Sequence, residues 1–219
     1  MLRITAAAIL LATSSVAFAA DTEPADPAKA QQYVETVCIA CHGMDGNGLD
    51  PENPITMYPM ISGQNAEYIL KQLNEFYVDV SADPPKPALR EEPNMNAMLA
   101  AVPPSEFKHL AAYFAQQKIA HSKVTADEET LALGKKLWKF GDMKKGIPAC
   151  TGCHGPNGHG MPAQYPALAG QYPEYLELQL NNFRQGLRTN DPSQMMRMTA
   201  EKMSDKEIKA VSQYAASLR

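Results

Sequence analysis

The stretch CIACHGMDGNG at residues 38–48 occurs a second time in closely related form, as CTGCHGPNGHG at residues 150–160. Each copy contains two cysteines separated by two residues, and a histidine directly follows the second cysteine. The chain has 4 cysteines, and these two stretches contain all of them. The fold and the chemistry of the chain therefore have to account for a repeated Cys-x-x-Cys-His pattern.

Three kinds of site use two cysteines at this spacing, and each places different demands on the rest of the chain. A thioredoxin-like redox pair belongs to a βαβ unit, and no convincing run of alternating β-type residues is found here. A zinc site needs four ligands, whereas this pattern provides at most three in each copy. Disulfides are compatible with an exported protein, but they leave the histidine after the second cysteine unexplained.

Cys-x-x-Cys-His is the pattern of covalent c-type haem attachment. The two thiols add across the two vinyl groups on one edge of the porphyrin, and the following histidine then lies beneath the ring and can ligate the iron. We therefore expect two covalently attached haem c groups. The predicted residues are Cys38, Cys41 and His42 for the first haem, and Cys150, Cys153 and His154 for the second.

The repeat extends well beyond the cysteines. Residues 58–76, YPMISGQNAEYILKQLNEF, align with residues 165–183, YPALAGQYPEYLELQLNNF, at an offset of 107. Residues 94–114, NMNAMLAAVPPSEFKHLAAYF, align with residues 195–215, MMRMTAEKMSDKEIKAVSQYA, at an offset of 101. Self-similarity of this kind indicates repeated structural units, and the change of offset places longer loops in the first copy.

The chain is accordingly predicted to contain two homologous domains. Their expected limits are residues 21–118 and 127–219, joined by a linker at residues 119–126. In each unit apolar residues recur at helical intervals, and Pro, Ser, Asp and Glu stand where helices typically begin. The expected helices lie within residues 27–41, 65–78, 103–117, 127–140, 172–186 and 203–218. We therefore predict an all-α fold in which each domain wraps around one haem.

The second axial ligand of each iron has to come from elsewhere in the unit, and a methionine thioether suits it because sulfur favours the ferrous state. The methionines in the later loops are Met95, Met98, Met195, Met196 and Met198. At the offset of 101 only Met95 and Met196 align with each other, so we predict these two as iron ligands. His159 stays open as an alternative ligand, although it has no counterpart in the first unit. His109 and His121 are expected to be surface or packing residues.

Two prolines, Pro59 and Pro166, stand at equivalent places, each directly after a tyrosine. A ligating histidine normally donates its second ring proton to an acceptor that fixes the orientation of the ring. We expect the carbonyl groups of these prolines to accept that proton. The alternative is that they are loop prolines that merely end a turn.

Residues 1–20 have the layout of a secretory signal peptide, with Arg3 in a positive head, an apolar run, and the small-residue sequence Ala17-Phe18-Ala19 near the end. We expect this segment to be removed on export to the periplasm. No later stretch approaches the ~20 apolar residues needed to span a bilayer, so the mature protein is not expected to cross the membrane.

Charge is distributed unevenly along the chain. Residues 21–124 contain 7 Lys or Arg and 14 Asp or Glu, a net charge of −7, whereas residues 125–219 contain 12 and 10, a net charge of +2. A nucleic-acid-binding protein would be uniformly basic, which argues against that class. The imbalance is either an accident of a solvated surface or the mark of a molecule that docks different partners at its two ends.

The chain resembles the dihaem cytochrome c4 family. The resemblance is carried by the two Cys-x-x-Cys-His units, the YPxxxGQ stretch after each, a methionine before a helix reading AAYF or its equivalent, and NDPSQMM at residues 190–196. It implies two class I cytochrome c domains in tandem, related by a pseudo-twofold axis, with the haem propionate edges near the shared interface. The first unit departs from the family in two enlarged loops, DPENPITM and DPPKPALREEPN.

The resemblance also implies a function, that of a periplasmic electron carrier and not an enzyme. Such a carrier takes electrons from a respiratory donor, either a dehydrogenase or a membrane complex, and delivers them to a terminal oxidase. Its partners are redox proteins rather than nucleic acids, and docking at membrane complexes is compatible with it. Two alternatives remain: a cytochrome subunit of a larger dehydrogenase, such as a sulfide-oxidising flavocytochrome, and a small dihaem enzyme acting as a peroxidase or on thiosulfate.

Overall fold

The computed structural model describes residues 23–48 and 58–219. The predicted signal peptide at residues 1–20 and the loop DPENPITM lie outside the described residues. Within the described ranges the regular structure is helical, and β pairing is limited to the isolated bridges Asp79–Lys86, Asp142–Ile147 and Met161–Tyr165. The predicted all-α fold is confirmed. In this part of the chain, no helix combines the length and the apolar character needed to span a membrane.

The N-terminal domain begins with one continuous helical run. It consists of a 3₁₀ turn η1 (Pro27–Ala30), α1 (Gln31–Tyr33), a π-helical turn η2 (Val34–Cys38) and α2 (Ile39–His42). The run begins at Asp26 because its carboxylate accepts a hydrogen bond from the amide of Ala28. The domain continues with α3 (Ala66–Phe76), α4 (Pro93–Leu99), a 3₁₀ turn η3 (Pro104–Glu106) and α5 (Phe107–Ala115).

The C-terminal domain has its main helices in a corresponding order, although its first helix and its motif helix are separated by a loop. It contains α6 (Glu128–Phe140), α7 (Thr151–His154), α8 (Pro173–Arg184), a 3₁₀ turn η4 (Pro192–Gln194), α9 (Met195–Ala200) and α10 (Asp205–Ser217). The first and last helices begin at strong caps. Asp127 accepts a hydrogen bond from the amide of Thr130, and Ser204 and Glu207 form a capping box. Each of the six stretches expected to be helical contains a helix.

The stretches around the predicted ligand methionines differ from the expectation, because they form the short helices α4 and α9 instead of loops. The Glu92 carboxylate accepts a hydrogen bond from the Met95 amide at 2.8 Å. The Asp191 carboxylate accepts one from the Met196 amide at 2.9 Å. A carboxylate at a helix N-terminus satisfies an unpaired amide and interacts favourably with the helix dipole, so these turns are stable without marked apolar periodicity.

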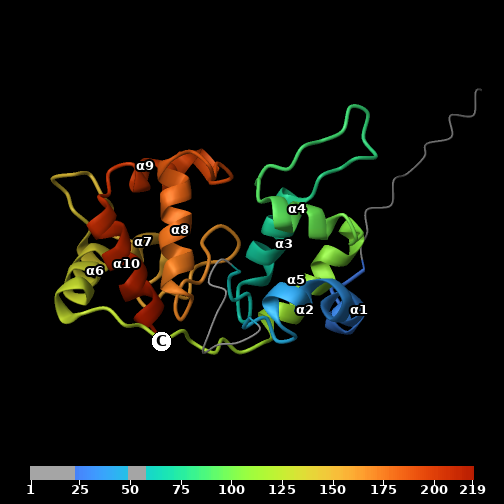
Figure 1. Cartoon of the computed structure of the whole chain (residues 1–219), viewed down its shortest axis with the longest axis horizontal. Helices are drawn as coiled ribbons and strands as arrows, with labels where there is room; N and C mark the ends of the chain where they lie inside the picture. Colours follow the sequence, from blue (N-terminus) through green and yellow to red (C-terminus); the bar gives the residue numbers. More distant parts are fainter. Residues whose placement is uncertain (1–22, 49–57) are drawn as a thin grey trace, which may run out of the picture.

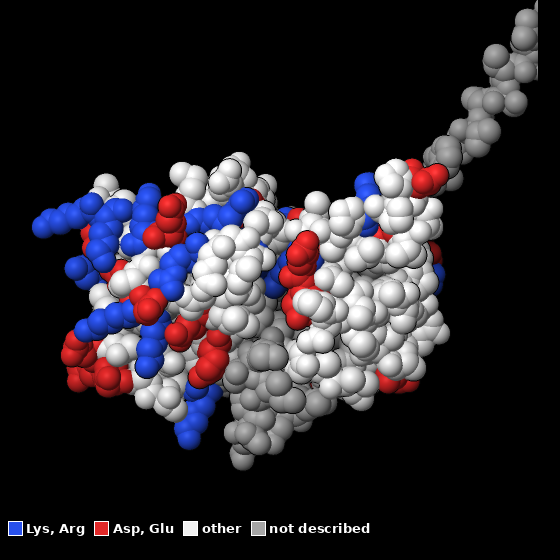
Figure 2. All heavy atoms as spheres, turned by 45° about the horizontal axis from the view of Figure 1, so that its top comes forward, with Lys and Arg blue, Asp and Glu red and all other residues white. Residues whose placement is uncertain are grey.

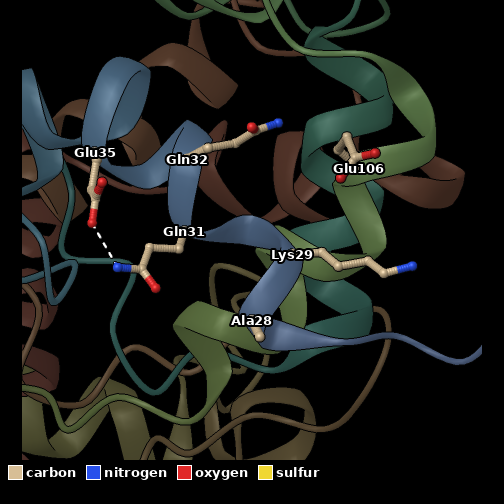
Figure 3. A pocket seen from close by; sticks show the side chains of 6 residues that line it. All are labelled: Ala28, Lys29, Gln31, Gln32, Glu35 and Glu106. Carbon is tan, nitrogen blue, oxygen red and sulfur yellow. Dashed lines mark hydrogen bonds between the residues drawn. The ribbon is translucent and has the colours of Figure 1, made fainter.

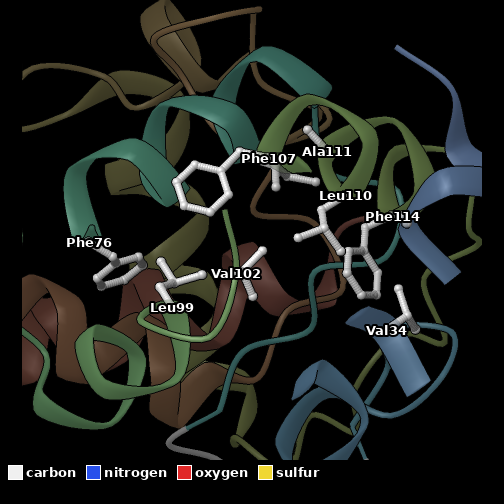
Figure 4. Close-up of a cluster of buried hydrophobic side chains, with 10 residues drawn as sticks. Val34, Phe76, Leu99, Val102, Phe107, Leu110, Ala111 and Phe114 are labelled. Carbon is white, nitrogen blue, oxygen red and sulfur yellow. The ribbon is translucent and has the colours of Figure 1, made fainter. Parts of the chain in front are cut away.

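Each domain has its own hydrophobic core. In the N-terminal domain, side chains from η2, α3, α4 and α5 meet, as Figure 4 shows for Val34, Phe76, Leu99, Val102, Phe107, Leu110, Ala111 and Phe114. In the C-terminal domain, the largest fully buried side chains are Trp138, Leu137, Ile147 and Ile208. The helices α6 and α10 cross where Gly134 faces Ala210, and a Cβ at Gly134 would overlap the Ala210 carbonyl oxygen.

The two domains lie side by side, and the linker segment between α5 and α6 joins them (Figure 1). Ser122 in this linker donates its amide to the Gly170 carbonyl at 2.8 Å and its hydroxyl to the Gln171 carbonyl at 2.7 Å. The Tyr172 hydroxyl donates to the Asn47 carbonyl at 2.8 Å. The C-terminal domain is thus tied both to the linker and to the loop that follows the first cysteine motif.

An open depression lies beside η1 and α1 (Figure 3). It is lined by Ala28, Lys29, Gln31, Gln32, Glu35 and Glu106. The Gln31 amide donates to the carboxylate of Glu35, four residues further along the same helical run, at 2.7 Å. None of the residues predicted to bind haem lines this depression, so it is not the predicted site.

Candidate functional site

The two Cys-x-x-Cys-His motifs form short helical turns that end at the histidines. His42 is the last residue of α2, and His154 is the last residue of α7. The next residues, Gly43 and Gly155, have φ of 71° and 77°, a conformation that favours glycine, so each helix ends directly after its histidine. Both histidines are buried, and the four cysteines are half-buried. Each domain therefore presents one imidazole and two thiols on a single turn.

The two histidine rings are held by the same kind of hydrogen bond. Nδ1 of His42 donates to the carbonyl oxygen of Pro59 at 2.9 Å, and Nδ1 of His154 donates to that of Pro166 at 3.0 Å. These are the prolines that the repeat singles out. With the proton on Nδ1, the lone pair is on Nε2 and is available to a metal ion. Burial lowers the pKa of both histidines, so the rings are neutral ligands at neutral pH.

The first cysteine of each motif lies in an apolar environment. Burial raises the pKa of Cys38 and of Cys150 to about 11. A thioether bond to a haem vinyl group carries no charge, so it is compatible with this apolar environment.

Met95 and Met196 lie near the starts of the equivalent helices α4 and α9, and both side chains are half-buried. Met95 packs against the N-terminal core. Among the neighbours of Met196, Met195 accepts a hydrogen bond from the Tyr165 hydroxyl at 3.8 Å, and Met198 is 54% exposed. A solvent-facing thioether is poorly placed to ligate a buried iron, which argues against Met198.

The remaining histidines have other surroundings. His109 is buried and accepts a hydrogen bond from the Asp26 amide at 2.8 Å, so it joins α5 to the start of η1. His121 lies in the linker against Gly170, where a Cβ would overlap its ring. His159 is exposed, which disfavours it as an axial ligand.

Sequence reasoning missed a polar cluster between the domains. Its members are Arg90, Arg188, Tyr68, Tyr175, Gln72 and Gln179. Each arginine donates to the glutamine of its own domain and to the tyrosine and glutamine of the other domain, over distances of 2.5–3.2 Å. The tyrosines and glutamines align at the offset of 107 and could have been noticed; the arginines, 98 residues apart, could not.

This cluster holds more positive than negative charge. The hydrogen-bond partners of both guanidinium groups described above are neutral amides and phenols. The nearby Glu75 carboxylate forms an ion pair with Lys71 at 2.6 Å. Arg90 is buried, and a buried cation is normally balanced by an anion. The cluster therefore suits a ligand with carboxylate groups, and each haem carries two propionates.

Comparison with known proteins assigns both halves of the chain to the same family. The family model of cytochrome c matches residues 27–118 and again residues 131–219. Cytochrome c4 of Azotobacter vinelandii is 40% identical over 196 residues, covering 89% of this chain and 90% of the relative. The thiosulfate dehydrogenase electron acceptor of Stutzerimonas stutzeri (strain A1501) is 35% identical, covering 83% of this chain and 78% of the relative.

Among solved structures, reduced recombinant cytochrome c4 from Pseudomonas stutzeri matches with a TM-score of 0.76 at 37% identity, covering 89% of this chain and 100% of that chain. The sequence repeat, the tandem helical domains and the similarity to cytochrome c4 over most of both chains agree. The chain is a member of the cytochrome c family, an electron-transfer dihaem cytochrome of the c4 type with two covalently attached haem c groups.

Proposed function

We propose that this cytochrome carries electrons in the periplasm from a respiratory donor, either a dehydrogenase or a membrane complex, to a terminal oxidase. One observation gives the main support for the proposed haem sites: in both domains a buried histidine directly after the cysteine pair donates Nδ1–H to a proline carbonyl. Cys38 and Cys41 in the first domain, and Cys150 and Cys153 in the second, would hold the haem groups through thioether bonds. His42 and Met95 would hold the first iron, and His154 and Met196 would hold the second.

Bound haem supplies the Fe(II)/Fe(III) couple, and the polypeptide supplies its surroundings. The proline carbonyls hold the histidine rings in one orientation, and the hydrophobic cores keep water away from them. Arg90 and Arg188 provide positive charge for the haem carboxylates at the domain boundary. With a histidine and a methionine holding each iron, no position would be left for a substrate, and the protein would act as a carrier rather than an enzyme.

The charge distribution supports a basic docking surface on the C-terminal domain. Figure 2 shows Lys and Arg gathered over that domain, beside a largely uncharged face of the N-terminal domain. The exposed residues in the second half of α6 and just after it include Lys135, Lys136, Lys139, Phe140, Met143, Lys144 and Lys145. An apolar tip surrounded by lysines suits a redox partner with an acidic surface, because complementary charges steer the encounter.

The likeness to a thiosulfate dehydrogenase electron acceptor favours a second donor class, a soluble dehydrogenase that oxidises sulfur compounds. Stopped-flow mixing of the oxidised cytochrome with each donor class distinguishes the two. The true donor reduces both haems in a second-order reaction, and its rate constant falls steeply with salt. A salt-independent rate would contradict docking through the lysines.

The haem sites themselves are tested by intact-mass and absorption measurements on periplasmic protein. We expect two haem masses on the polypeptide and a near-infrared band from sulfur–iron bonds. Met95→Ala and Met196→Ala should each remove about half of this band and open the iron to cyanide or carbon monoxide. Met198→Ala, at an exposed position, is the matched control. A wild-type protein that binds these ligands readily would contradict the filled coordination and favour a dihaem enzyme.

A further inference from the structure

Two glutamines at equivalent places reach across the domain boundary. Gln64 and Gln171 align at the offset of 107 and follow Gly63 and Gly170, whose φ values are 64° and 77°. Both amides make two hydrogen bonds to the backbone of one residue in the other domain. The partner of Gln171 is Met60, and the partner of Gln64 is Ala167.

The distances are alike in the two pairs. Gln171 Nε2 donates to the Met60 carbonyl at 2.7 Å, and the Met60 amide donates to Gln171 Oε1 at 3.0 Å. Gln64 Nε2 donates to the Ala167 carbonyl at 2.9 Å, and the Ala167 amide donates to Gln64 Oε1 at 2.9 Å. A reciprocal pair of this kind fixes both the position and the orientation of the side-chain amide.

Each amide is also held from its own domain. The amide of Tyr172 donates to Gln171 Oε1 at 3.0 Å, and the amide of Asn65 donates to Gln64 Oε1 at 2.9 Å. Gln171 and Met60 are both buried, whereas Gln64 and Ala167 are half-buried. The bond through Gln171 is therefore the better shielded from water.

The peptide group that each glutamine contacts is the one that holds a histidine of the other domain. The carbonyl of Pro59 accepts the proton of His42, and the amide that completes this peptide group is that of Met60. In the C-terminal domain the carbonyl of Pro166 and the amide of Ala167 form the equivalent peptide group. Each histidine is thus joined through one peptide group to a glutamine of the opposite domain.

Hydrogen bonds on the two sides of a peptide group strengthen each other. When the amide donates to a glutamine oxygen, electron density moves toward the carbonyl oxygen, which becomes a better acceptor. A stronger acceptor draws the Nδ1 proton further from the histidine and makes Nε2 a stronger electron donor to a bound metal. The glutamine in one domain can therefore adjust the ligand in the other.

We propose that Gln64 and Gln171 are positioning residues that act across the domain boundary, each setting the hydrogen bond of the iron-ligating histidine in the opposite domain. The inference rests on the proposed ligation by His42 and His154. It means that neither haem environment is complete until the two domains are docked. It also provides a direct structural link between the two redox centres.

The test replaces each glutamine by leucine, which has a similar size and no hydrogen-bonding group, in the full dihaem protein. Gln171→Leu should raise the reduction potential of the N-terminal haem, and Gln64→Leu should raise that of the C-terminal haem. We expect a change of about two- to threefold in the ferrous-to-ferric ratio at fixed potential, because hydrogen-bond cooperativity is a modest effect. Gln117→Leu is the matched control, because it removes a half-buried amide that lies just after α5 and donates to the Tyr113 carbonyl of its own domain at 3.2 Å.

A second readout follows the hydrogen bond directly. In the ferrous protein, the Nδ1–H resonance of His42 should move upfield and exchange faster with solvent in Gln171→Leu, and that of His154 should do so in Gln64→Leu. Shifts confined to the mutated domain, equal shifts in both haems, or no shift would overturn the inference. Because the two sites are independent, one variant that fails to fold leaves the other as a complete test.

The same spectra separate this inference from the proposed haem ligation. Wild-type protein that lacks haem-shifted ring resonances of His42 and His154 would refute the ligation. Wild-type protein with both histidines bound, together with uncrossed shifts in the glutamine variants, would refute only the role of the glutamines.

Discussion

Gly134→Ala is expected to destabilise the C-terminal domain, because Gly134 lies where α6 crosses α10. A Cβ there would lie 2.7 Å from Cβ of Tyr214 and 2.8 Å from the carbonyl carbon of Ala210. These separations are about 1 Å shorter than the ~3.5–4.0 Å of an ordinary carbon contact. Since the obstacle includes backbone, the helices have to separate or shift to accommodate the methyl group.

The energy can be worked from two opposing effects. Overpacking a core costs about 1–3 kcal/mol, and contact with backbone places this site near the upper end. Alanine favours a helix over glycine by about 1 kcal/mol, which offsets part of that cost. The net loss is about 2 kcal/mol, and for a domain of this size each kcal/mol lowers the melting temperature by about 4–8 °C.

The assay uses the single tryptophan of the chain. Trp138 is 1% exposed in α6, so its fluorescence reports unfolding of this domain when the haem no longer quenches it. Gly152→Ala is the matched control, because a Cβ at this helical position meets no atom within 4 Å and the first motif already has Ala40 there. The control should be neutral or more stable. A Gly134→Ala protein that melts at or above the wild-type temperature would refute the close-crossing argument.

Three further predictions concern pH and charge. Burial pushes the pKa of Glu207 upward, but hydrogen bonds from Lys145 and from the cap of α10 outweigh this effect and hold the pKa below 4.5. The ionised carboxylate therefore stabilises the fold above pH 4.5, and this stabilisation is lost as the pH falls through the lowered pKa. Glu207→Gln should flatten the acid side of the profile of melting temperature against pH, and an unchanged profile would contradict this. Changing Lys135, Lys136 and Lys139 together to Glu should slow reduction by an acidic partner by about tenfold or more at low salt and remove the salt dependence, as measured by stopped flow. Arg188→Leu should lower both reduction potentials, because a unit positive charge near each haem is lost; the expected change is on the order of 1 kcal/mol. Unchanged potentials in a spectroelectrochemical titration would exclude Arg188 as a counter-charge for the haem carboxylates.

The interface between the two domains is pseudo-symmetric. Residues of the two domains make reciprocal contacts: Arg90 and Arg188, which no repeat offset relates, each bond the opposite tyrosine and glutamine, and the aligned Gln64 and Gln171 each bond the opposite peptide. The surfaces away from the interface are under no such constraint. This explains how the domains can share one interior arrangement and still differ in net charge.

The sequence alone determined the features that depend on residues close together in the chain. Two cysteines and a histidine within five residues lie close together whatever the rest of the chain does, so the haem-attachment motifs could be recognised from the sequence. The repeat and the helix starts were readable for the same reason, since apolar spacing and caps are local. The methionines were selected by alignment, and their ligation stays a prediction.

Only the tertiary structure decided which distant residues meet. Gln171 lies 111 residues from the Met60 backbone that it contacts, and Arg90 lies 85 residues from Tyr175. The loop from the end of α3 to Arg90 is longer than the loop from the end of α8 to Arg188, so no repeat offset relates the two arginines. Such contacts depend on how two complete domains dock, and docking is set by the summed fit of two surfaces rather than by any local pattern.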